Sequence, residues 1–273
     1  MKNLTGQYCF THSSGEDIYL FTLFNERGTT VGITNYGATI CSFKLMEPDG
    51  TYNDIVLGFE KVEDYFSPTY LEGYPYFGCI VGRYANRIKN GHFRIDDQEF
   101  QVAKNKGGDH LHGGLDGFDK KTWQFVSASD THLRLRCLSP DGEEGYPGNL
   151  SVEIHFELTE NDELQYEFFA GTDRATAINL THHSYFNLHN GQGKIDNHII
   201  RIASDRILEQ DDNFVVTGKE IPVAGTRYDF IQPRPVGRDW IAEDGYDQSF
   251  VLHESNGELQ LAAEVQSENA DLS

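Results

Sequence analysis

Two adjacent histidines, His182 and His183, lie in a run that has the pattern of a β-strand and gives way to a loop near Asn187. Neighbouring side chains of a strand point to opposite faces, so one imidazole can face a concave site while the other packs behind it. Histidine has an unperturbed pKa of about 6.5, which suits proton donation and acceptance at neutral pH. The spacing alone is equally consistent with a structural pair that satisfies nearby backbone groups.

A second segment that could carry chemistry runs from Val81 to Ile88 and contains Asn86 and Arg87. The guanidinium of Arg87 could offer a rigid fork of donors to hydroxyl or carboxylate oxygens. A solvated or salt-bridged arginine is the alternative interpretation at this point.

A third segment contains His110 and His112, followed by two glycines that would let a ligand approach the backbone closely. If this segment is a strand, both imidazoles share one face and could bind a metal ion with His183 as the third ligand. Loop-capping histidines are the other interpretation. The nearest acids, Asp109 and Asp116, do not alternate correctly with the histidines, so we predict no metal site.

Two turn-like segments carry carboxylates. The segment from Asp141 to Leu150 contains two glutamates, Glu143 and Glu144, just before a strong strand, which is typical of a tight surface turn. In the segment from Gly245 to Phe250, Asp247 could accept hydrogen bonds from hydroxyl groups. No phosphate-binding glycine loop and no G-x-S-x-G nucleophile motif is found, so neither a nucleotide nor a nucleophilic serine is indicated.

The elements that must position these residues follow a period of two. Apolar residues alternate with polar ones in two runs separated by a polar turn at residues 160–163, which predicts an antiparallel hairpin; they are Leu150, Val152, Ile154, Phe156 and Leu158, then Leu164, Tyr166, Phe168 and Ala170. A similar strand is predicted at residues 133–137, a second hairpin around Asp96 and Asp97, and a last strand at residues 259–265. Helical periodicity is nearly absent outside residues 62–66. We therefore predict an all-β fold, a large antiparallel β-sandwich, as a single domain over residues 1–273.

Composition limits the possible partners. The chain has 273 residues and a net charge of −21. Such a surface repels phosphate backbones and anionic membranes, so we expect a small neutral molecule as partner, no nucleic acid and no membrane. Four widely spaced cysteines indicate reduced thiols of a cytoplasmic protein, and neither a secretory signal nor a membrane-spanning run is evident; the cysteines are Cys9, Cys41, Cys79 and Cys137.

Taken together, six segments in order resemble the aldose 1-epimerase, or galactose mutarotase, family. They are Asn35–Thr39, Val81–Ile88, Leu111–Gly114 with Gly117–Lys120, Asp141–Leu150, Asn179–Leu188 and Gly245–Asp247. The resemblance implies a β-sandwich of the galactose mutarotase-like type with a shallow sugar site on its concave sheet.

The resemblance also implies a site and a reaction. The residues that it assigns to sugar binding or catalysis are Asn86, Arg87, His112, His183, Tyr185 and Asp247. A base removes the proton from O1 of an aldose such as galactose or glucose, an acid protonates O5, and the ring closes again as the other anomer, with no cofactor. His183 would be the acid, with His112 beside it as a catalytic and binding residue, and His182 would face away.

The family's base is a glutamate in a C-terminal segment that would follow Ser273, and we find no such segment in the sequence. We therefore expect the domain to be incomplete at its C-terminus. Two other functions are compatible with the residues. One is a carbohydrate-binding protein without turnover. The other is a metal-dependent sugar isomerase that uses His110, His112 and His183.

Overall fold

The computed structural model describes residues 6–240, 245–253 and 257–267. Its contacts divide the chain into two compact units, Met1–Phe186 and Asn187–Ser273, and each is described by itself. The single domain over residues 1–273 stays a prediction. None of the helices within the described ranges has the length and apolar character needed to cross a bilayer.

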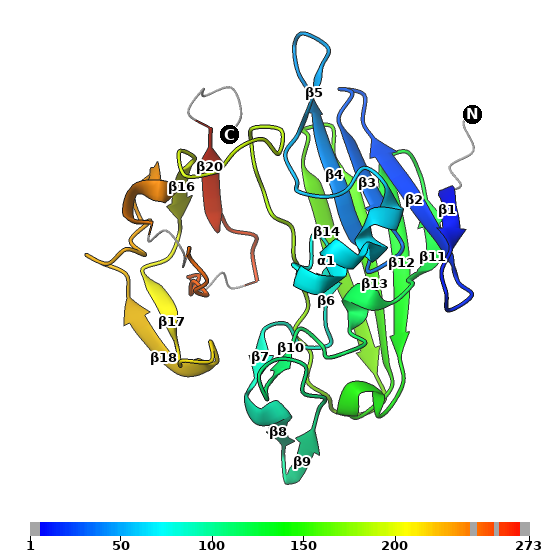
Figure 1. Ribbon diagram of the computed structural model, residues 1–273, viewed down its shortest axis with the longest axis vertical. Helices are drawn as coiled ribbons and strands as arrows, with labels where there is room; N and C mark the ends of the chain where they lie inside the picture. Colours follow the sequence, from blue (N-terminus) through cyan, green and yellow to red (C-terminus); the bar gives the residue numbers. More distant parts are fainter. Residues whose placement is uncertain (1–5, 241–244, 254–256, 268–273) are drawn as a thin grey trace. The chain divides into compact units, whose positions relative to one another are not determined.

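The first unit contains two antiparallel sheets (Figure 1). The first sheet has five strands in chain order: β1 (Gln7–Thr11), β2 (Asp17–Phe24), β3 (Thr30–Thr34), β4 (Thr39–Met46) and β5 (Tyr52–Asp54). The second has four, also in chain order: β11 (Gln124–Ala128), β12 (His132–Ser139), β13 (Leu150–Leu158) and β14 (Leu164–Thr172). Both sheets contribute to one apolar core, as in a β-sandwich. The predicted fold class is therefore confirmed.

The alternation in the sequence predicts this core well. Every apolar residue of β13 from Leu150 to Leu158 is at most 1% exposed, whereas none of the polar residues between them is buried. β13 and β14 pair in the predicted hairpin, with Leu158 opposite Leu164. Leu133, Leu135 and Cys137 face the same core from β12. Three of the four free cysteines are buried, as their spacing suggested.

Short elements connect the two sheets and provide the residues of interest. β6 (Ile80–Val81) pairs with β15 (Thr181–His182), and β7 (Arg87–Ile88) pairs with β10 (His110–Leu111). The predicted hairpin around Asp96 is formed by β8 (His92–Ile95) and β9 (Gln98–Gln101). Single turns of 3-10 helix occur at η1 (Val62–Phe66), η2 (Lys89–Gly91), η3 (Phe118–Lys120) and η4 (Glu143–Gly145).

One helix was not expected from the sequence. Helix α1 (Pro68–Gly73) begins where the hydroxyl of Ser67 accepts a hydrogen bond from the backbone N–H of Tyr70 (3.3 Å), with Pro68 in the first turn. It ends at Tyr74, whose backbone is left-handed (φ 35°). The helix spans only six residues, which is too short for a helical period to be recognised in the sequence.

The second unit consists of small antiparallel sheets. β16 (Ile199–Ile202) pairs with β19 (Arg234–Pro235) and β20 (Ala263–Gln266), and β17 (Arg206–Gln210) pairs with β18 (Val216–Pro222). A 3-10 turn, η5, spans Val236–Asp239. The last predicted strand was placed too early, because β20 begins at Ala263 and both Leu259 and Leu261 are exposed.

The alternation in β13 makes a stability prediction. Phe156→Ala should lower the free energy of unfolding by about 3–5 kcal/mol, because it leaves a cavity in the shared core. Phe169→Ala, in the neighbouring strand, is the matched control because Phe169 is 50% exposed. Denaturant unfolding should show a much smaller loss for the control. Equal losses would mean that the two faces of this hairpin are not distinct.

Candidate functional site

The backbone pairing of β6 with β15 positions His183. Ile80 lies opposite His182 in this pairing. Beyond the strand, the backbone N–H of His183 donates to the carbonyl of Cys79 (2.9 Å), and the N–H of Gly78 donates to the carbonyl of His183 (3.1 Å). These bonds fix the register, so His183 lies beside the chain that leads into β6.

The pairing of β7 with β10 positions His112 in the same way. Arg87 lies opposite Leu111. The backbone N–H of His112 then donates to the carbonyl of Asn86 (3.1 Å), and the N–H of Asn86 donates to Nδ1 of His112 (3.0 Å). Asn86 and His112 both have left-handed backbones (φ 65° and 52°), which asparagine adopts more readily than most residues. The two residues therefore hold each other through backbone and ring.

Four rings come together at this point. The imidazoles of His112 and His183 lie 5.3 Å apart at 87°, and the phenol ring of Tyr76 lies 4.8 Å from His112 and 5.6 Å from His183. The ring of Tyr185, which is 38% exposed, lies 5.2 Å from His183. Two imidazoles flanked by aromatic rings can exchange protons with a hydroxylated molecule that binds beside them.

His112 is held as a neutral imidazole. Its pKa is lowered to about 3, chiefly by burial and also by the nearby His183 and the positively charged Arg87. Because Nδ1 accepts the N–H of Asn86, the proton of the neutral ring lies on Nε2. Nε2 makes no hydrogen bond with any residue that the structure describes. His112 is therefore prepared to donate one hydrogen bond to a ligand oxygen.

His182 faces a different environment from its neighbour. Its ring lies 5.6 Å from that of Tyr166, and its Nε2 is 3.0 Å from the hydroxyl of Ser184. Burial lowers the pKa of His182 to about 4. The two adjacent histidines thus point to different neighbours, as alternation along a strand predicts, although the strand itself covers only Thr181 and His182.

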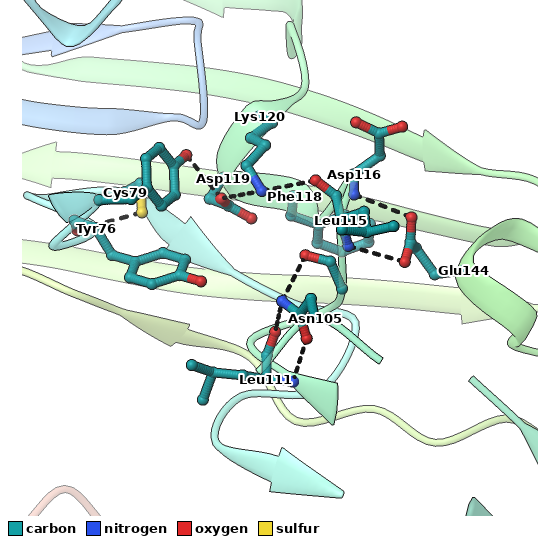
Figure 2. A network of polar contacts seen from close by, with 12 residues as sticks. Tyr76, Cys79, Asn105, Leu111, Leu115, Asp116, Phe118, Asp119, Lys120 and Glu144 are labelled. Atoms are coloured by element: carbon teal, nitrogen blue, oxygen red, sulfur yellow. Dashed lines mark hydrogen bonds and ion pairs between the residues drawn. The ribbon is translucent and has the colours of Figure 1, made fainter. Parts of the chain in front are cut away.

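The loop that carries His112 is fixed by side chains from outside it (Figure 2). The amide of Asn105 accepts from the N–H of Leu111 (2.7 Å) and donates to its carbonyl (2.9 Å). The carboxylate of Glu144 accepts from the N–H groups of Leu115 (2.9 Å) and Asp116 (3.0 Å). These bonds leave the segment from residue 111 to residue 116 little freedom to move.

Gly113 shows how closely this loop packs. Its φ is +94°, and a Cβ atom at this position would lie 1.8 Å from the carbonyl oxygen of Gly82. Any side chain would therefore force apart the segments that carry His112 and Arg87. The glycine in this motif serves close packing between two backbones at the edge of the site.

Comparison with known proteins identifies the family of the chain. A family model described as aldose 1-epimerase matches residues 19–273. The chain belongs to the aldose 1-epimerase family. Its named relatives are isomerases. The aldose 1-epimerase of Escherichia coli K12 is 32% identical over 264 residues, which cover 94% of this chain and 75% of that protein. The galactose mutarotase of Sus scrofa is 40% identical over 240 residues, which cover 86% and 67%.

Solved structures of the aldose 1-epimerase family share the fold. The galactose 1-epimerase from Lactobacillus acidophilus superimposes with a TM-score of 0.82 at 29% identity, over 97% of this chain and 78% of that one. The aldose epimerase homologue from C. elegans superimposes with a TM-score of 0.84 at 24% identity, over 93% and 76%. The chain thus spans about three quarters of the length of these proteins.

Within this epimerase fold, the structure brings together five of the six residues that the resemblance assigned. Those in the first unit are Asn86, Arg87, His112, His183 and Tyr185. The charge of Arg87 acts on both His112 and Tyr76. Asp247 lies in the second unit, where it is exposed and its carbonyl accepts from the amide of Gln210 (2.9 Å). Its place in the site stays a prediction.

The expectation that His110 and His112 share a strand face is wrong. β10 ends at Leu111, and the left-handed backbone of His112 turns its side chain away from the strand alternation. His110 is fully buried, with Nδ1 2.6 Å from the carbonyl of Ala103 and Nε2 2.6 Å from the hydroxyl of Tyr146. Since both ring nitrogens of His110 are engaged, it cannot join His112 and His183 as a metal ligand.

The turn from Asp141 to Leu150 is confirmed as a turn, and its carboxylates have structural partners. Glu143 pairs with Lys121 at 2.5 Å, and Glu144 binds the loop after His112. Arg83, in the same segment as Arg87, is 2% exposed and donates to the carbonyls of Ser139 (2.8 Å) and Pro147 (3.1 Å). Arg83 therefore supports the loop, and its donors are directed to protein oxygens.

Sequence reasoning missed Tyr76. It belongs to an aromatic stretch, Tyr74–Phe77, that has no period of its own and resembles core packing. The only available signal was its position a few residues before the segment that contains Arg87. Asp119 belongs to a segment of the family resemblance, Gly117–Lys120, but was not predicted to be a site residue, although its side chain is buried.

The depressed pKa of His112 predicts a pH dependence of stability. The folded protein binds fewer protons at this ring than the unfolded chain does between about pH 6.5 and pH 3, so its contribution is present above pH 6.5 and is lost as the pH falls. Between pH 7 and pH 5, wild type should lose about 2 kcal/mol more unfolding free energy than His112→Asn. Denaturant unfolding at both pH values measures this difference. Parallel losses in the two proteins would contradict a neutral, buried His112.

Proposed function

We propose that this protein interconverts the α and β anomers of an aldose such as galactose or glucose by acid–base opening and closing of the sugar ring. The observation that carries the proposal is the pair of imidazoles, His112 and His183, 5.3 Å apart in a member of an isomerase family. Ring opening needs a proton donor near O5 and a proton acceptor near O1, and an imidazole can provide the donor at neutral pH without a cofactor.

In the proposed mechanism, His183 is the general acid. A base takes the proton of the O1 hydroxyl, the C1–O5 bond breaks, and His183 gives its proton to O5. The open aldehyde then turns about the C1–C2 bond, and the same steps in reverse close the ring as the other anomer. By resemblance we assign the base to a glutamate, and none of the residues described is given that role.

The remaining site residues would bind and orient the sugar. The neutral ring of His112 has its Nε2–H available for a sugar oxygen, as its bond from Asn86 requires. Arg87 would donate charge-assisted hydrogen bonds to sugar hydroxyls, and Asp247 would accept them. Tyr185, which is partly exposed beside His183, would offer an aromatic surface to the apolar face of the sugar. Four free cysteines suit a reducing compartment, and we place this activity in the cytoplasm.

The first test of this function concerns His183. His183→Asn should lower kcat for mutarotation by about 10²–10⁴-fold, the usual contribution of a general acid, with little change in sugar affinity. Polarimetry of freshly dissolved α-galactose measures the rate above that of buffer. His132→Asn, at an exposed histidine in β12, is the matched control and should leave the rate unchanged.

Two outcomes of this experiment would count against the proposal. Near wild-type mutarotation by His183→Asn would remove His183 from the mechanism. A wild-type protein that binds galactose but leaves its optical rotation to change at the buffer rate would be a carbohydrate-binding protein instead of an epimerase.

The second test concerns recognition. Arg87→Ala and Asp247→Ala should each weaken sugar binding by about 1.5–3 kcal/mol, because each would remove a charge-assisted hydrogen bond. Arg87→Lys should not restore affinity, since the planar fork is lost. Arg134→Ala, at an exposed arginine in β12, is the control. Unaltered KM in both alanine variants would show that these two positions are structural.

A further inference from the structure

Asp119 is a carboxylate that the proposed mechanism does not use. It lies in η3, and its side chain is fully buried. Its Oδ2 accepts a hydrogen bond from the hydroxyl of Tyr74 (2.8 Å) and lies 3.8 Å from Nζ of Lys120, as Figure 2 shows for Asp119 and Lys120. Its Oδ1 has no hydrogen-bond partner within the described part of the chain. Burying a carboxylate that is only partly hydrogen-bonded costs folding free energy. We therefore ask what the contact between Asp119 and Tyr74 provides.

The charge state of Asp119 decides how strongly it can accept the hydrogen bond from Tyr74. Burial raises its pKa to about 6, and the opposing effects of Lys120 and the Tyr74 hydrogen bond do not cancel this rise. At neutral pH the group is therefore mainly a carboxylate. A charged acceptor binds a phenol hydroxyl more strongly than a neutral one does, so the orientation of Tyr74 is well defined.

Tyr74 in turn supports Tyr76. The two rings meet edge to face, with centroids 4.7 Å apart at 76°. The ammonium group of Lys120 also lies over the Tyr74 ring, 4.9 Å from its centroid. The backbone of Tyr74 is fixed as well, because its N–H donates to the carbonyl of Tyr70 (2.7 Å) at the end of α1. Tyr74 thus provides a well-fixed packing surface for the ring of Tyr76.

Tyr76 lies between Tyr74 and the two histidines. Its ring contacts both His112 and His183, and its carbonyl accepts from the N–H of Cys79 (3.3 Å). Its backbone is left-handed (φ 60°), a conformation that a tyrosine keeps only when its surroundings hold it. Its hydroxyl makes no hydrogen bond with any described residue. A phenol that is so constrained, yet has an unused donor and acceptor, is suited to bind a ligand.

We propose that the hydroxyl of Tyr76 binds a hydroxyl of the sugar beside His112 and His183, and that Asp119 is a positioning residue that acts on Tyr76 through Tyr74. This inference rests on the proposed function and adds a recognition residue to it. Burial and the charge of Asp119 raise the pKa of Tyr76, so the phenol stays neutral and can both donate and accept. Its ring is already held in place, so little conformational entropy is lost on binding.

Tyr76→Phe tests the contact with the sugar. The variant keeps the ring that packs on the two histidines and removes only the hydroxyl. KM for galactose should rise about two- to tenfold, the size of one neutral hydrogen bond, and kcat should change little. Tyr52→Phe, at an exposed tyrosine in β5, is the matched control. An active enzyme whose KM is unchanged by Tyr76→Phe would overturn the proposal.

A double-mutant cycle tests the role of Asp119. Asp119→Ala should raise KM as Tyr76→Phe does, whereas Asp119→Asn should keep most of the affinity because the amide oxygen still accepts from Tyr74. In the Tyr76→Phe background, Asp119→Ala should add little, since its effect passes through the lost hydroxyl. Additive effects on KM would show a merely structural carboxylate. Asp97→Ala, in the exposed turn after β8, is the control for loss of a carboxylate.

A second variant keeps the cycle valid if Asp119→Ala does not fold. Tyr74→Phe removes the hydroxyl that Asp119 accepts from and preserves the ring. It should raise KM by itself and add little to Tyr76→Phe. Near-UV circular dichroism reports whether each variant is folded. If Tyr74→Phe has wild-type KM in a folded, active enzyme, then Asp119 does not act through Tyr74.

The outcomes separate this inference from the proposed function. If wild type binds galactose without turnover, only the proposed reaction fails, and the same cycle can be measured on the galactose dissociation constant by NMR titration. If wild type turns over galactose and the Tyr76 and Asp119 variants match it, only the present inference fails. Absence of both binding and turnover would overturn both.

Discussion

The site depends on one segment, residues 76–88, which pairs through its backbone with both histidine-bearing segments. At one end, β6 pairs with β15 and sets His183, and at the other, β7 pairs with β10 and sets His112. Side chains alternate along a strand, so a slip of one residue between β6 and β15 would exchange the places of His182 and His183. The identity of the residue that faces the site is thus decided by hydrogen bonds between backbones, and the large sandwich holds these short pairings in place.

A strand pairing with only two residues from each strand is weak by itself. Here polar side chains add hydrogen bonds that hold these segments in place. Asn105 and Glu144 bind the backbone of the loop after β10 at both of its ends, and Arg83, in the middle of the shared segment, donates to the carbonyls of Ser139 and Pro147. Each of these side chains satisfies backbone groups that no strand partner can reach. Glycine allows many backbone conformations, so a loop that contains Gly113 needs these hydrogen bonds to hold His112 in one orientation.

Much of the fold could be predicted from the sequence, because alternation of apolar and polar residues is a local signal. β13 with β14, and β8 with β9, follow it directly. The grouping of Arg87, His112 and His183 came from the order of motifs, since nothing local brings positions so far apart together. Helix α1 and Tyr76 were missed for two different reasons. The first is too short to show a period, and the second owes its position to Tyr74 and Asp119, whose contact spans 45 residues.

Comparison of His110 and His112 shows why residue type and spacing alone do not define a role. Both imidazoles belong to one short segment, but His110 has both ring nitrogens within 2.6 Å of protein oxygens, whereas among the described residues His112 has a partner only at Nδ1. The change occurs at His112, where the backbone turns left-handed and the strand ends. A ring with two protein partners stabilises the fold, and a ring with one can still serve a ligand. In this chain the backbone conformation of a single residue therefore separates a structural histidine from one that is available for chemistry.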